Sequence, residues 1–332
     1  MTRWCMVGFL PVALYFLVPV LIHFFPWCLQ YMFFLNFVRI PFQNFTNLTH
    51  YGINSAGRNF YLRGENGLRL GCWHILPSEL AMNYRYSILN AREMELLMAA
   101  ANNSVIVYLH GNSFDRSQST RCGLYNLLAN MGFHVLALDY RGYGDSNGSP
   151  SENGLIEDAK EIFRYARSHS GSNDIYLWGH SMGTAIATAA AMEFSEKGLP
   201  PAGLILESPF NNLSDVVTHH PYAIPFRWLP WFKNMVLESL DRSGLDMNTD
   251  YRITKVDCPI LILHAEDDHI IPLQLARKLR DSAVAAKRDV TLKEFDASRN
   301  FHHKFIYLAE ELPRILRRFM EKCTMKAKKA LK

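Results

Sequence analysis

The residue with the clearest chemical context is Ser181, which lies at the centre of the pentapeptide G-H-S-M-G at residues 179–183. Residues 174–178 before it are typical of a short buried strand, and the alanine-rich residues 184–192 after it are typical of a closely packed helix. In that context G-x-S-x-G predicts a nucleophile elbow, a strained turn that holds a serine hydroxyl at the N-terminus of a helix. The sequence therefore predicts a serine hydrolase. The alternative is a small-residue strand-to-helix turn without chemistry.

A carboxylate able to orient a catalytic base follows an apolar strand further along the chain. Residues 259–264 predict that strand, and three acidic residues come directly after it. The catalytic residues of α/β hydrolases follow the order Ser, Asp or Glu, His, and open α/β sheets place their sites at the carboxyl ends of strands. Asp268 is the predicted acid because its spacing to Pro272 gives a D-x-x-x-P loop. Asp267 is the second choice, and Glu207, at the end of an earlier strand, is the third.

The catalytic base is expected in the loop between the last strand and the last helix. Residues 290–295 predict that strand, and the helix is predicted from about residue 310 to residue 322. The loop between them contains His302 and His303, and an imidazole in this loop is placed to reach the serine. The residues alone leave these two adjacent candidates open.

Serine, aspartate and histidine in this order predict acyl transfer through an acyl-enzyme. The histidine takes the serine proton as the hydroxyl attacks an ester carbonyl, the aspartate fixes the imidazole tautomer, and water then cleaves the acyl-enzyme. The oxyanion needs fixed donors, which we predict to be the backbone N–H groups of Met182 and Asn112. Asn112 follows the strand at residues 105–109 in a His-Gly loop, and the alternative for that loop is a simple strand-terminating turn.

A third turn, D-Y-R-G-x-G-x-S, follows the apolar strand at residues 134–139. Its charged residues Asp139, Arg141 and Asp145 are expected to form a salt bridge that braces the loop. We therefore leave them out of the predicted catalytic set.

The length of 332 residues fits one large catalytic domain with an appendage. From about residue 105 onward apolar strands alternate with helical segments, which predicts an α/β fold with a mostly parallel sheet flanked by helices. The 35 lysines and arginines barely exceed the 31 aspartates and glutamates, so no nucleic-acid partner is predicted. The six cysteines show no C-x-x-C spacing, and no phosphate-binding glycine loop is present. No metal and no cofactor is therefore predicted.

Residues 1–40 are predicted to form a membrane anchor. Residues 4–25 are apolar except for His23, and as a helix they would span roughly 33 Å, enough to cross a bilayer. Only Arg3 precedes them and no small-residue cleavage site follows, which favours an uncleaved signal-anchor. Residues 27–38 are a second apolar run, too short to span and expected to lie in the membrane interface. The alternative for this run is a buried core helix.

Two glycosylation sequons, at Asn44 and Asn47, follow the predicted anchor directly. This pair favours a luminal position for the catalytic domain, which we expect at residues 41–325. The charges flanking the anchor give almost no positive-inside bias. The lysine-rich residues 326–332 are expected to be a frayed, solvated tail.

A long insert, residues 208–257, separates the strand at residues 203–207 from the strand that precedes Asp268. Its middle, residues 221–232, is rich in aromatic side chains, and α/β hydrolases place the cap over the active site at this point of the chain. An apolar cap near a membrane anchor predicts a lipid ester as substrate. The alternative is that these aromatic side chains only pack the cap onto the sheet.

Several segments are more specific than the general hydrolase motifs, namely residues 34–39, 108–112, 139–142, 178–181, 206–210, 261–268, 303–304 and 312–316. Through them the chain as a whole resembles the α/β-hydrolase domain-containing protein twelve family of membrane-anchored lysophosphatidylserine lipases. The resemblance implies an α/β-hydrolase fold with Ser181 as nucleophile, Asp268 as acid and His303 as base. It also implies hydrolysis of lysophosphatidylserine and monoacylglycerols, at a single-pass anchor in the endoplasmic reticulum membrane with the catalytic domain in the lumen.

The chain departs from the family pattern at two places near the predicted site. Met182 stands where the family usually has leucine, and residues 300–302 stand where it has a glycine-containing loop. Neither change removes a predicted catalytic residue. Two other classes remain as alternatives: a protein acyl-thioesterase, because the same residues cleave thioesters, and a non-catalytic lipid-binding protein with the same fold.

Overall fold

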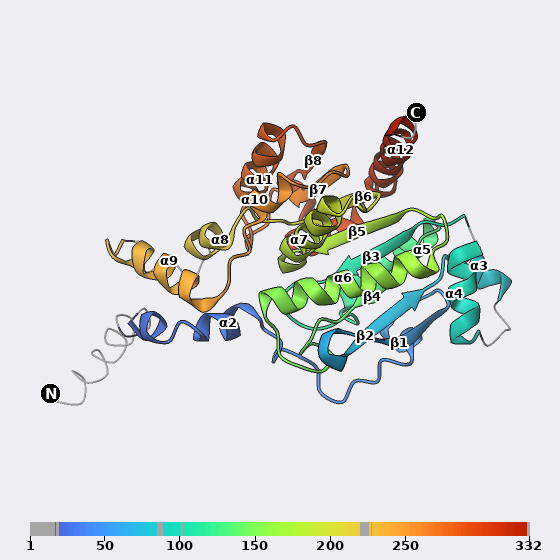
Figure 1. The fold of residues 1–332 in the computed structure, drawn as a ribbon, viewed down its shortest axis with the longest axis horizontal. Helices are drawn as coiled ribbons and strands as arrows, with labels where there is room; N and C mark the ends of the chain where they lie inside the picture. Colours follow the sequence, from blue (N-terminus) through green and yellow to red (C-terminus); the bar gives the residue numbers. More distant parts are fainter. Residues whose placement is uncertain are drawn as a thin grey trace.

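The sheet has eight strands, and its order is β1-β2-β4-β3-β5-β6-β7-β8 (Figure 1). The computed structural model describes residues 17, 20–84, 89–100, 102–219, 226 and 228–330. Strand β2 pairs antiparallel with β1 and β4, and the strands from β3 to β8 run parallel, which confirms the mostly parallel sheet. The strands are β1 (Gly57–Arg63), β2 (Arg69–Ile75), β3 (Val105–Leu109), β4 (His134–Leu138), β5 (Ile175–His180), β6 (Gly203–Glu207), β7 (Ile260–Ala265) and β8 (Val290–Phe295).

Helices precede, connect and follow these strands. They are α2 (Cys28–Phe33), α3 (Ser78–Asn83), α4 (Ala91–Ala100), α5 (Ser119–Asn130), α6 (Glu152–His169), α7 (Met182–Glu196), α8 (Leu213–His219), α9 (Phe232–Ser243), α10 (Thr249–Ile253), α11 (Leu273–Ala285) and α12 (Leu312–Ala330). Short 3₁₀ turns lie at Leu48–Tyr51, Glu65–Gly67, Ala297–Arg299 and Ile306–Leu308.

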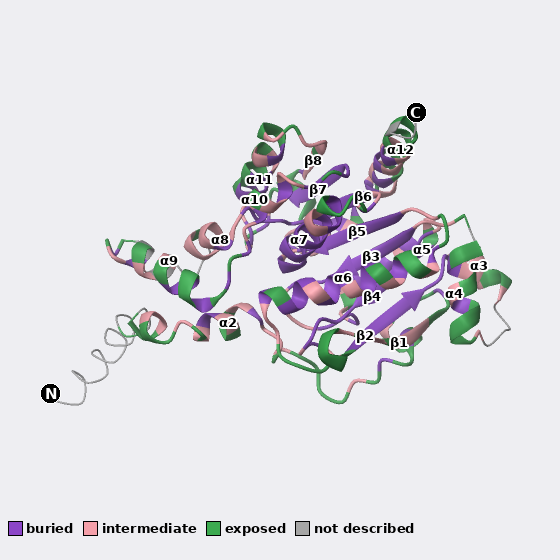
Figure 2. Cartoon of the chain, in the orientation of Figure 1, coloured by how far each residue is buried: buried purple, intermediate pink, exposed green. Residues whose placement is uncertain are grey.

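The sheet is the middle of three layers, with α6, α7 and α11 on one face and α5 and α12 on the other. Successive side chains of a strand point to opposite faces. Val105 and Leu109 of β3 accordingly pack into the first core, and Ile106 and Tyr108 pack into the second. The strands from β3 to β7 are buried throughout (Figure 2), which is why they appear in the sequence as continuous apolar runs.

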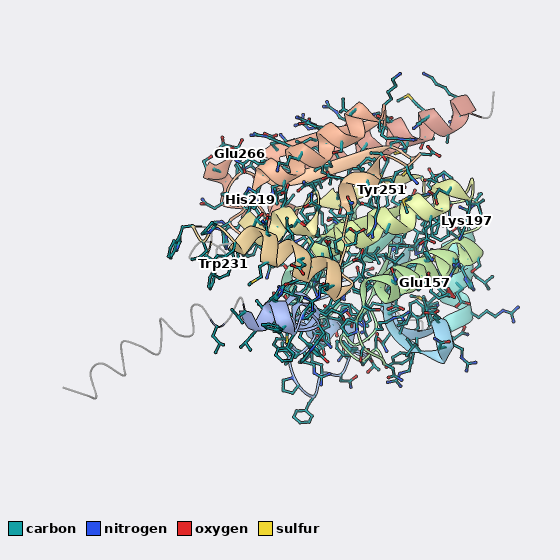
Figure 3. The ribbon with its side chains drawn as sticks, turned by 60° about the vertical axis from the view of Figure 1, so that its left-hand side comes forward. Glu157, Lys197, His219, Trp231, Tyr251 and Glu266 are labelled. Carbon is teal, nitrogen blue, oxygen red and sulfur yellow. The ribbon has the colours of Figure 1, made fainter. Side chains whose placement is uncertain are left out.

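The insert between β6 and β7 forms a cap that contains α8, α9 and α10. Figure 3 shows His219 of α8 and Trp231, just before α9, at the same end of the molecule as Glu266 in the loop after β7. Lys197, after α7, lies at the opposite end. The cap therefore lies at the carboxyl edge of the parallel strands. Residues 221–225 and 227, part of the predicted aromatic run, lie outside the described residues.

The predicted transmembrane helix at residues 4–25 lies mostly outside the described residues. Within the part of the chain that the structure describes, no helix combines the length and the apolar character needed to cross a membrane. The predicted interfacial segment at residues 27–38 is only partly buried. Leu29 and Phe34 pack into the core, whereas a group of apolar side chains is exposed, namely Trp27, Tyr31, Met32 and Phe37.

The last helix is longer than the sequence pattern predicts. Leu312, Leu316, Phe319 and Cys323, spaced three or four residues apart, pack it onto the sheet. From this packed part the helix continues to Ala330, so residues 326–330 are helical and not frayed. The lysine side chains of this last part are exposed to solvent.

Candidate active site

Ser181 lies in a sharp turn between β5 and α7 and has a left-handed backbone conformation, with φ 53° and ψ −121°. Such a conformation costs a non-glycine residue about 1–3 kcal/mol. Hydrogen bonds on both sides hold it: the Ser181 N–H donates to the Glu207 carbonyl at 2.9 Å, and the Ser181 carbonyl accepts from the Thr184 N–H at 2.9 Å. The structure therefore contains the predicted nucleophile elbow.

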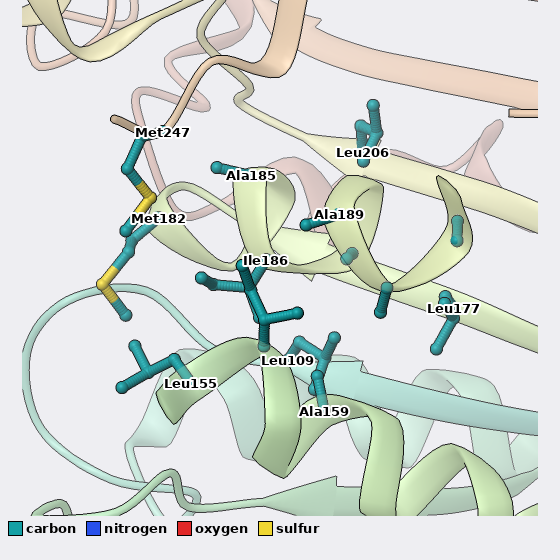
Figure 4. Packing of buried hydrophobic residues seen from close by; sticks show 14 of the residues in the cluster. Leu109, Leu155, Ala159, Leu177, Met182, Ala185, Ile186, Ala189, Leu206 and Met247 are labelled. Carbon is teal, nitrogen blue, oxygen red and sulfur yellow. The ribbon is translucent and has the colours of Figure 1, made fainter. Parts of the chain in front are cut away.

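The two glycines of the pentapeptide allow this turn to pack tightly. A Cβ atom on Gly183 would lie 2.1 Å from the Leu109 carbonyl oxygen, and one on Gly179 would lie 2.4 Å from the Gly183 carbonyl oxygen. Both partners are backbone atoms that cannot move aside. Figure 4 shows Ala185 and Ala189 along the same helix, beside Ile186, where small side chains bring α7 close to the sheet.

His303 and Asp268 form a buried pair at the same edge of the sheet. The His303 Nδ1 atom lies 2.7 Å from Asp268 Oδ2, and the other carboxylate oxygen accepts from the Ile270 and Ile271 N–H groups, each at 2.9 Å. Burial by itself would raise the pKa of Asp268, but His303, His264 and the Ile271 N–H outweigh it and lower the pKa to about 2. Asp268 therefore stays ionised across the neutral pH range and can fix the His303 tautomer.

His302 has a partner of its own and faces outward. Its Nδ1 atom lies 2.9 Å from Asp267 Oδ2, and its backbone N–H donates to both Asp267 oxygens at 3.1 Å. The His302 side chain is 44% exposed, against 7% for His303. The structure thus separates the two candidate bases: each pairs with one aspartate, and only His303 is buried.

His180, directly before the nucleophile, connects the elbow to the histidine loop. Its Nε2 atom lies 2.9 Å from the His303 carbonyl oxygen. Burial and the neighbouring His303 ring lower the pKa of His180 to about 3, so the imidazole is neutral and its Nε2–H donates to that carbonyl. The sequence pattern gave no signal for this contact, because the two residues lie 123 positions apart in the chain.

Glu207, the third choice for the acid, does not contact the histidine loop through its side chain. The carboxylate is buried and accepts from the Trp178 Nε1–H at 2.9 Å. Burial raises the pKa of Glu207 to about 7, and the nearby charge of Asp268 adds to the effect. Glu207 therefore supports the elbow through its backbone carbonyl, and its side chain lies beneath the site.

Glu207 makes the stability of the fold depend on pH. Its pKa is about 7 in the folded protein, against an ordinary value of 4.5, so folding favours the protonated form. Its contribution to stability is present below pH 4.5 and is lost as the pH rises to about 7. Glu207→Gln keeps an acceptor for Trp178 but has no proton to lose. The free energy of unfolding, measured by thermal unfolding from pH 5 to pH 8, should fall less with rising pH in Glu207→Gln than in the wild type. The difference between the two proteins should reach up to about 3 kcal/mol. An equal pH dependence of stability in the two proteins would contradict the raised pKa of Glu207.

The loop after β3 places Asn112 beside the nucleophile. A Cβ atom on Gly111 would lie 3.3 Å from the Ser181 Cβ atom and 3.3 Å from His180 Nδ1, so the loop runs directly past the serine. The Asn112 carbonyl accepts from the Leu35 N–H at 3.0 Å and from the Tyr143 hydroxyl at 3.1 Å.

Met182 is the first residue of α7, and an N–H at this position has no acceptor within its helix. Its side chain is buried, and Figure 4 shows it near Met247 and Leu155 at the N-terminal end of α7. Of the two predicted oxyanion donors, Met182 thus follows Ser181 directly, and Asn112 lies in the loop that passes beside it.

The brace around the D-Y-R-G turn differs from the predicted one. Asp139 and Asp145 both pair with Arg116, at 2.8 Å in the case of Asp145, and Arg141 pairs with Asp158 of α6 at 2.7 Å. Arg116 is fully buried, and the sequence analysis missed it because it lies more than 20 residues from either partner. The expected salt bridge is present, but Arg116 supplies the cation.

Within the described residues no group of three or more His, Cys, Asp or Glu side chains is arranged to hold a metal ion. The arrangement that is present contains a strained serine, a histidine paired with a buried carboxylate, and a glycine-containing loop beside the serine. This set of groups can perform acyl transfer through an acyl-enzyme.

Comparison with known proteins agrees with this chemistry. The family model of the alpha/beta hydrolase fold matches residues 104–245. The lysophosphatidylserine lipase ABHD12 of Macaca fascicularis is 39% identical over 319 residues, which cover 95% of this chain and 79% of the relative. The human protein ABHD12B is 39% identical over 233 residues, covering 70% of this chain and 63% of the relative. The solved esterase Pf2001 of Pyrococcus furiosus has a TM-score of 0.61 at 18% identity, over 86% of this chain and 97% of that chain, and shares the fold.

Proposed function

We propose that this chain, which belongs to the family of ABHD12 lysophosphatidylserine lipases, hydrolyses the acyl ester of lysophosphatidylserine and of monoacylglycerols with Ser181 as nucleophile. It is an enzyme, a lipid hydrolase of the α/β-hydrolase fold. The substrates, the catalytic residues and the membrane attachment are the parts that we propose.

In the proposed mechanism His303 takes the proton of Ser181 as the hydroxyl attacks the acyl carbonyl. Asp268 holds the imidazole in the required tautomer and stabilises the imidazolium that forms. The backbone N–H groups of Met182 and Asn112 donate to the oxyanion. The protonated His303 then gives its proton to the leaving glycerol oxygen, and a water molecule activated by the same histidine cleaves the acyl-enzyme. The observation that carries the proposal is the buried His303–Asp268 pair at the sheet edge that holds Ser181.

The lipid substrate is supported by the apolar surface at this edge of the molecule. Trp228 of the cap is 69% exposed, and the exposed side chains of Trp27, Tyr31 and Met32 lie on α2 or just before it, next to α9 of the cap. Exposed aromatic side chains of this kind fit a membrane interface. We propose that the predicted anchor holds this edge against the bilayer, so that a lipid enters from the membrane.

We further propose a single-pass anchor in the endoplasmic reticulum membrane with the catalytic domain in the lumen. The paired sequons support this orientation, because Asn44 and Asn47 are both exposed in the folded protein. Their hydroxyl partners are already in place, since Thr46 donates to the Asn44 side chain and Thr49 to the Asn47 side chain, each at 2.6 Å.

The proposal is tested by fatty-acid release from four substrates, with detergent-solubilised full-length protein and its Ser181→Ala variant as matched control. The substrates are lysophosphatidylserine, lysophosphatidylcholine, a monoacylglycerol and an acyl-cysteine peptide. We expect Ser181-dependent release from lysophosphatidylserine and the monoacylglycerol. Release from the peptide alone would assign the chain to the thioesterases, and release from none would favour a lipid-binding protein without catalysis.

A further inference from the structure

A segment near the N-terminus runs alongside the loop that carries Asn112. Leu35 and Ser113 form a parallel β-bridge. The Leu35 N–H donates to the Asn112 carbonyl at 3.0 Å, and the Phe114 N–H donates to the Val38 carbonyl at 3.1 Å. These contacts join residues that are more than 70 positions apart in the sequence.

The Asn112 side chain adds a third bond to the same segment. Its Nδ2 atom donates to the Phe33 carbonyl at 3.1 Å. Together with the Tyr143 hydroxyl, which donates to the Asn112 carbonyl at 3.1 Å, these bonds hold Asn112 through both its side chain and its carbonyl. The Asn112 N–H belongs to the peptide plane of the Gly111 carbonyl, which accepts from His110 Nδ1 at 2.6 Å, so both peptide planes that meet at Asn112 are held by hydrogen bonds.

The segment is itself anchored firmly enough to act as a support. Phe34 is only 1% exposed and packs into the core that contains Met182. The Gln30 side chain donates to the Ser243 carbonyl of α9 at 2.6 Å, and the Asn36 side chain donates to the Gly142 carbonyl at 3.2 Å. The segment is therefore tied to the cap, to the core and to the loop after β4.

We propose that residues 33–38 form a positioning strand, which sets the direction of the Asn112 N–H toward the developing oxyanion. The inference rests on the proposed function, in which that N–H stabilises the transition state. Oxyanion donors act through preorganisation, and misdirecting one lowers kcat more than it affects substrate binding.

The positioning strand also connects the catalytic loop to the surface proposed to meet the lipid. It begins at the last residue of α2, and exposed apolar side chains lie on both: Tyr31 and Met32 on α2, and Phe37 on the positioning strand. A lipid surface that holds these side chains therefore also holds the strand that orients Asn112. The N-terminal region would then be part of the active site as well as its attachment to the membrane.

The test is a pair of substitutions at Leu35 in the full chain. Leu35→Pro removes the N–H that donates to Asn112, and Leu35→Ala keeps it. Proline is compatible with the preceding backbone, because Phe34 is extended, with φ −87° and ψ 91°. We expect Leu35→Pro to lower kcat on a water-soluble ester about tenfold or more, with KM changed less than about twofold. Leu35→Ala should keep kcat within about threefold of the wild type.

A transition-state analogue supplies a readout that a general loss of structure would not give. A trifluoromethyl ketone forms a hemiketal oxyanion on the serine, so its inhibition constant should weaken with Leu35→Pro by the same factor as kcat.

The proposal is overturned if folded Leu35→Pro matches Leu35→Ala in kcat. If Leu35→Pro shows no cooperative thermal transition, the kcat of Asn112→Ala is measured instead. This variant keeps the backbone N–H of residue 112 but loses the side-chain hydrogen bond to the Phe33 carbonyl. A wild-type kcat in Asn112→Ala would then overturn the proposal. Failure of the proposed function is distinct, since it appears as hydrolysis that persists in Ser181→Ala.

Discussion

Ser181→Ala is expected to lower kcat for lysophosphatidylserine by about 10⁴–10⁶-fold. The hydroxyl of Ser181 is the only group in the site proposed to form a bond to the acyl carbon. Without it His303 and the two oxyanion donors remain, but they have no nucleophile to activate. Initial rates of fatty-acid release at saturating substrate measure the effect. More than about 1% residual kcat would contradict the assignment of Ser181.

The backbone of Ser181 provides the control for this experiment. Alanine has the same penalty as serine at φ 53°, so Ser181→Ala should unfold at nearly the same temperature as the wild type. Glycine adopts this conformation without strain, so Ser181→Gly should be more stable by about 1–3 kcal/mol, although equally inactive. A lower unfolding temperature for Ser181→Gly would show that the turn is not strained.

His303→Ala is expected to lower kcat by about 10⁴-fold or more, because it removes both the base and the acid of the reaction. His302→Ala, one residue earlier, should change kcat by less than about threefold. The reason is geometric: His303 is buried against Asp268 at 2.7 Å, whereas His302 faces outward and pairs with Asp267. Side-by-side rates of the two variants check the prediction.

The pH dependence of kcat supplies a further comparison of the wild type with the two histidine variants. Since the pKa of Asp268 is about 2, its charge does not change above about pH 4, and it cannot produce the loss of activity on acidification. An acid limb in kcat therefore comes from a group other than Asp268, and it should persist in His302→Ala. If His302→Ala loses the larger part of kcat and His303→Ala does not, the base is His302.

The sequence predicts the elements of the site that depend on local pattern. G-x-S-x-G needs its glycines because the backbones of β3, β5 and α7 approach too closely for a Cβ atom, so the strand, turn and helix appear together in the sequence. Asp268 is predicted for a similar reason, since its loop needs a carboxylate that accepts two N–H groups within three residues. Short-range geometry of this kind can be predicted from a local sequence pattern.

Contacts between residues far apart in the chain cannot be predicted from a local sequence pattern. The spacing of residues does not separate His302 from His303. Their side chains point in different directions because the backbone at His302 has φ 47°, which turns the His302 side chain outward. Arg116 and the bridge between Leu35 and Ser113 were missed because their partners lie far away in the chain. The resemblance to a known family was needed to choose His303, and the structure adds that His303 is buried and paired with Asp268.

The contact between Gln30 and Ser243 has a consequence for the timing of synthesis. The two residues are 213 positions apart, so at ribosomal rates of about 5–20 residues per second roughly 10–40 s pass between them. During that interval α2 has been made, but its partner helix has not. The tie between the N-terminal segment and the cap can therefore form only when most of the chain has been translated, long after the segment itself has been made.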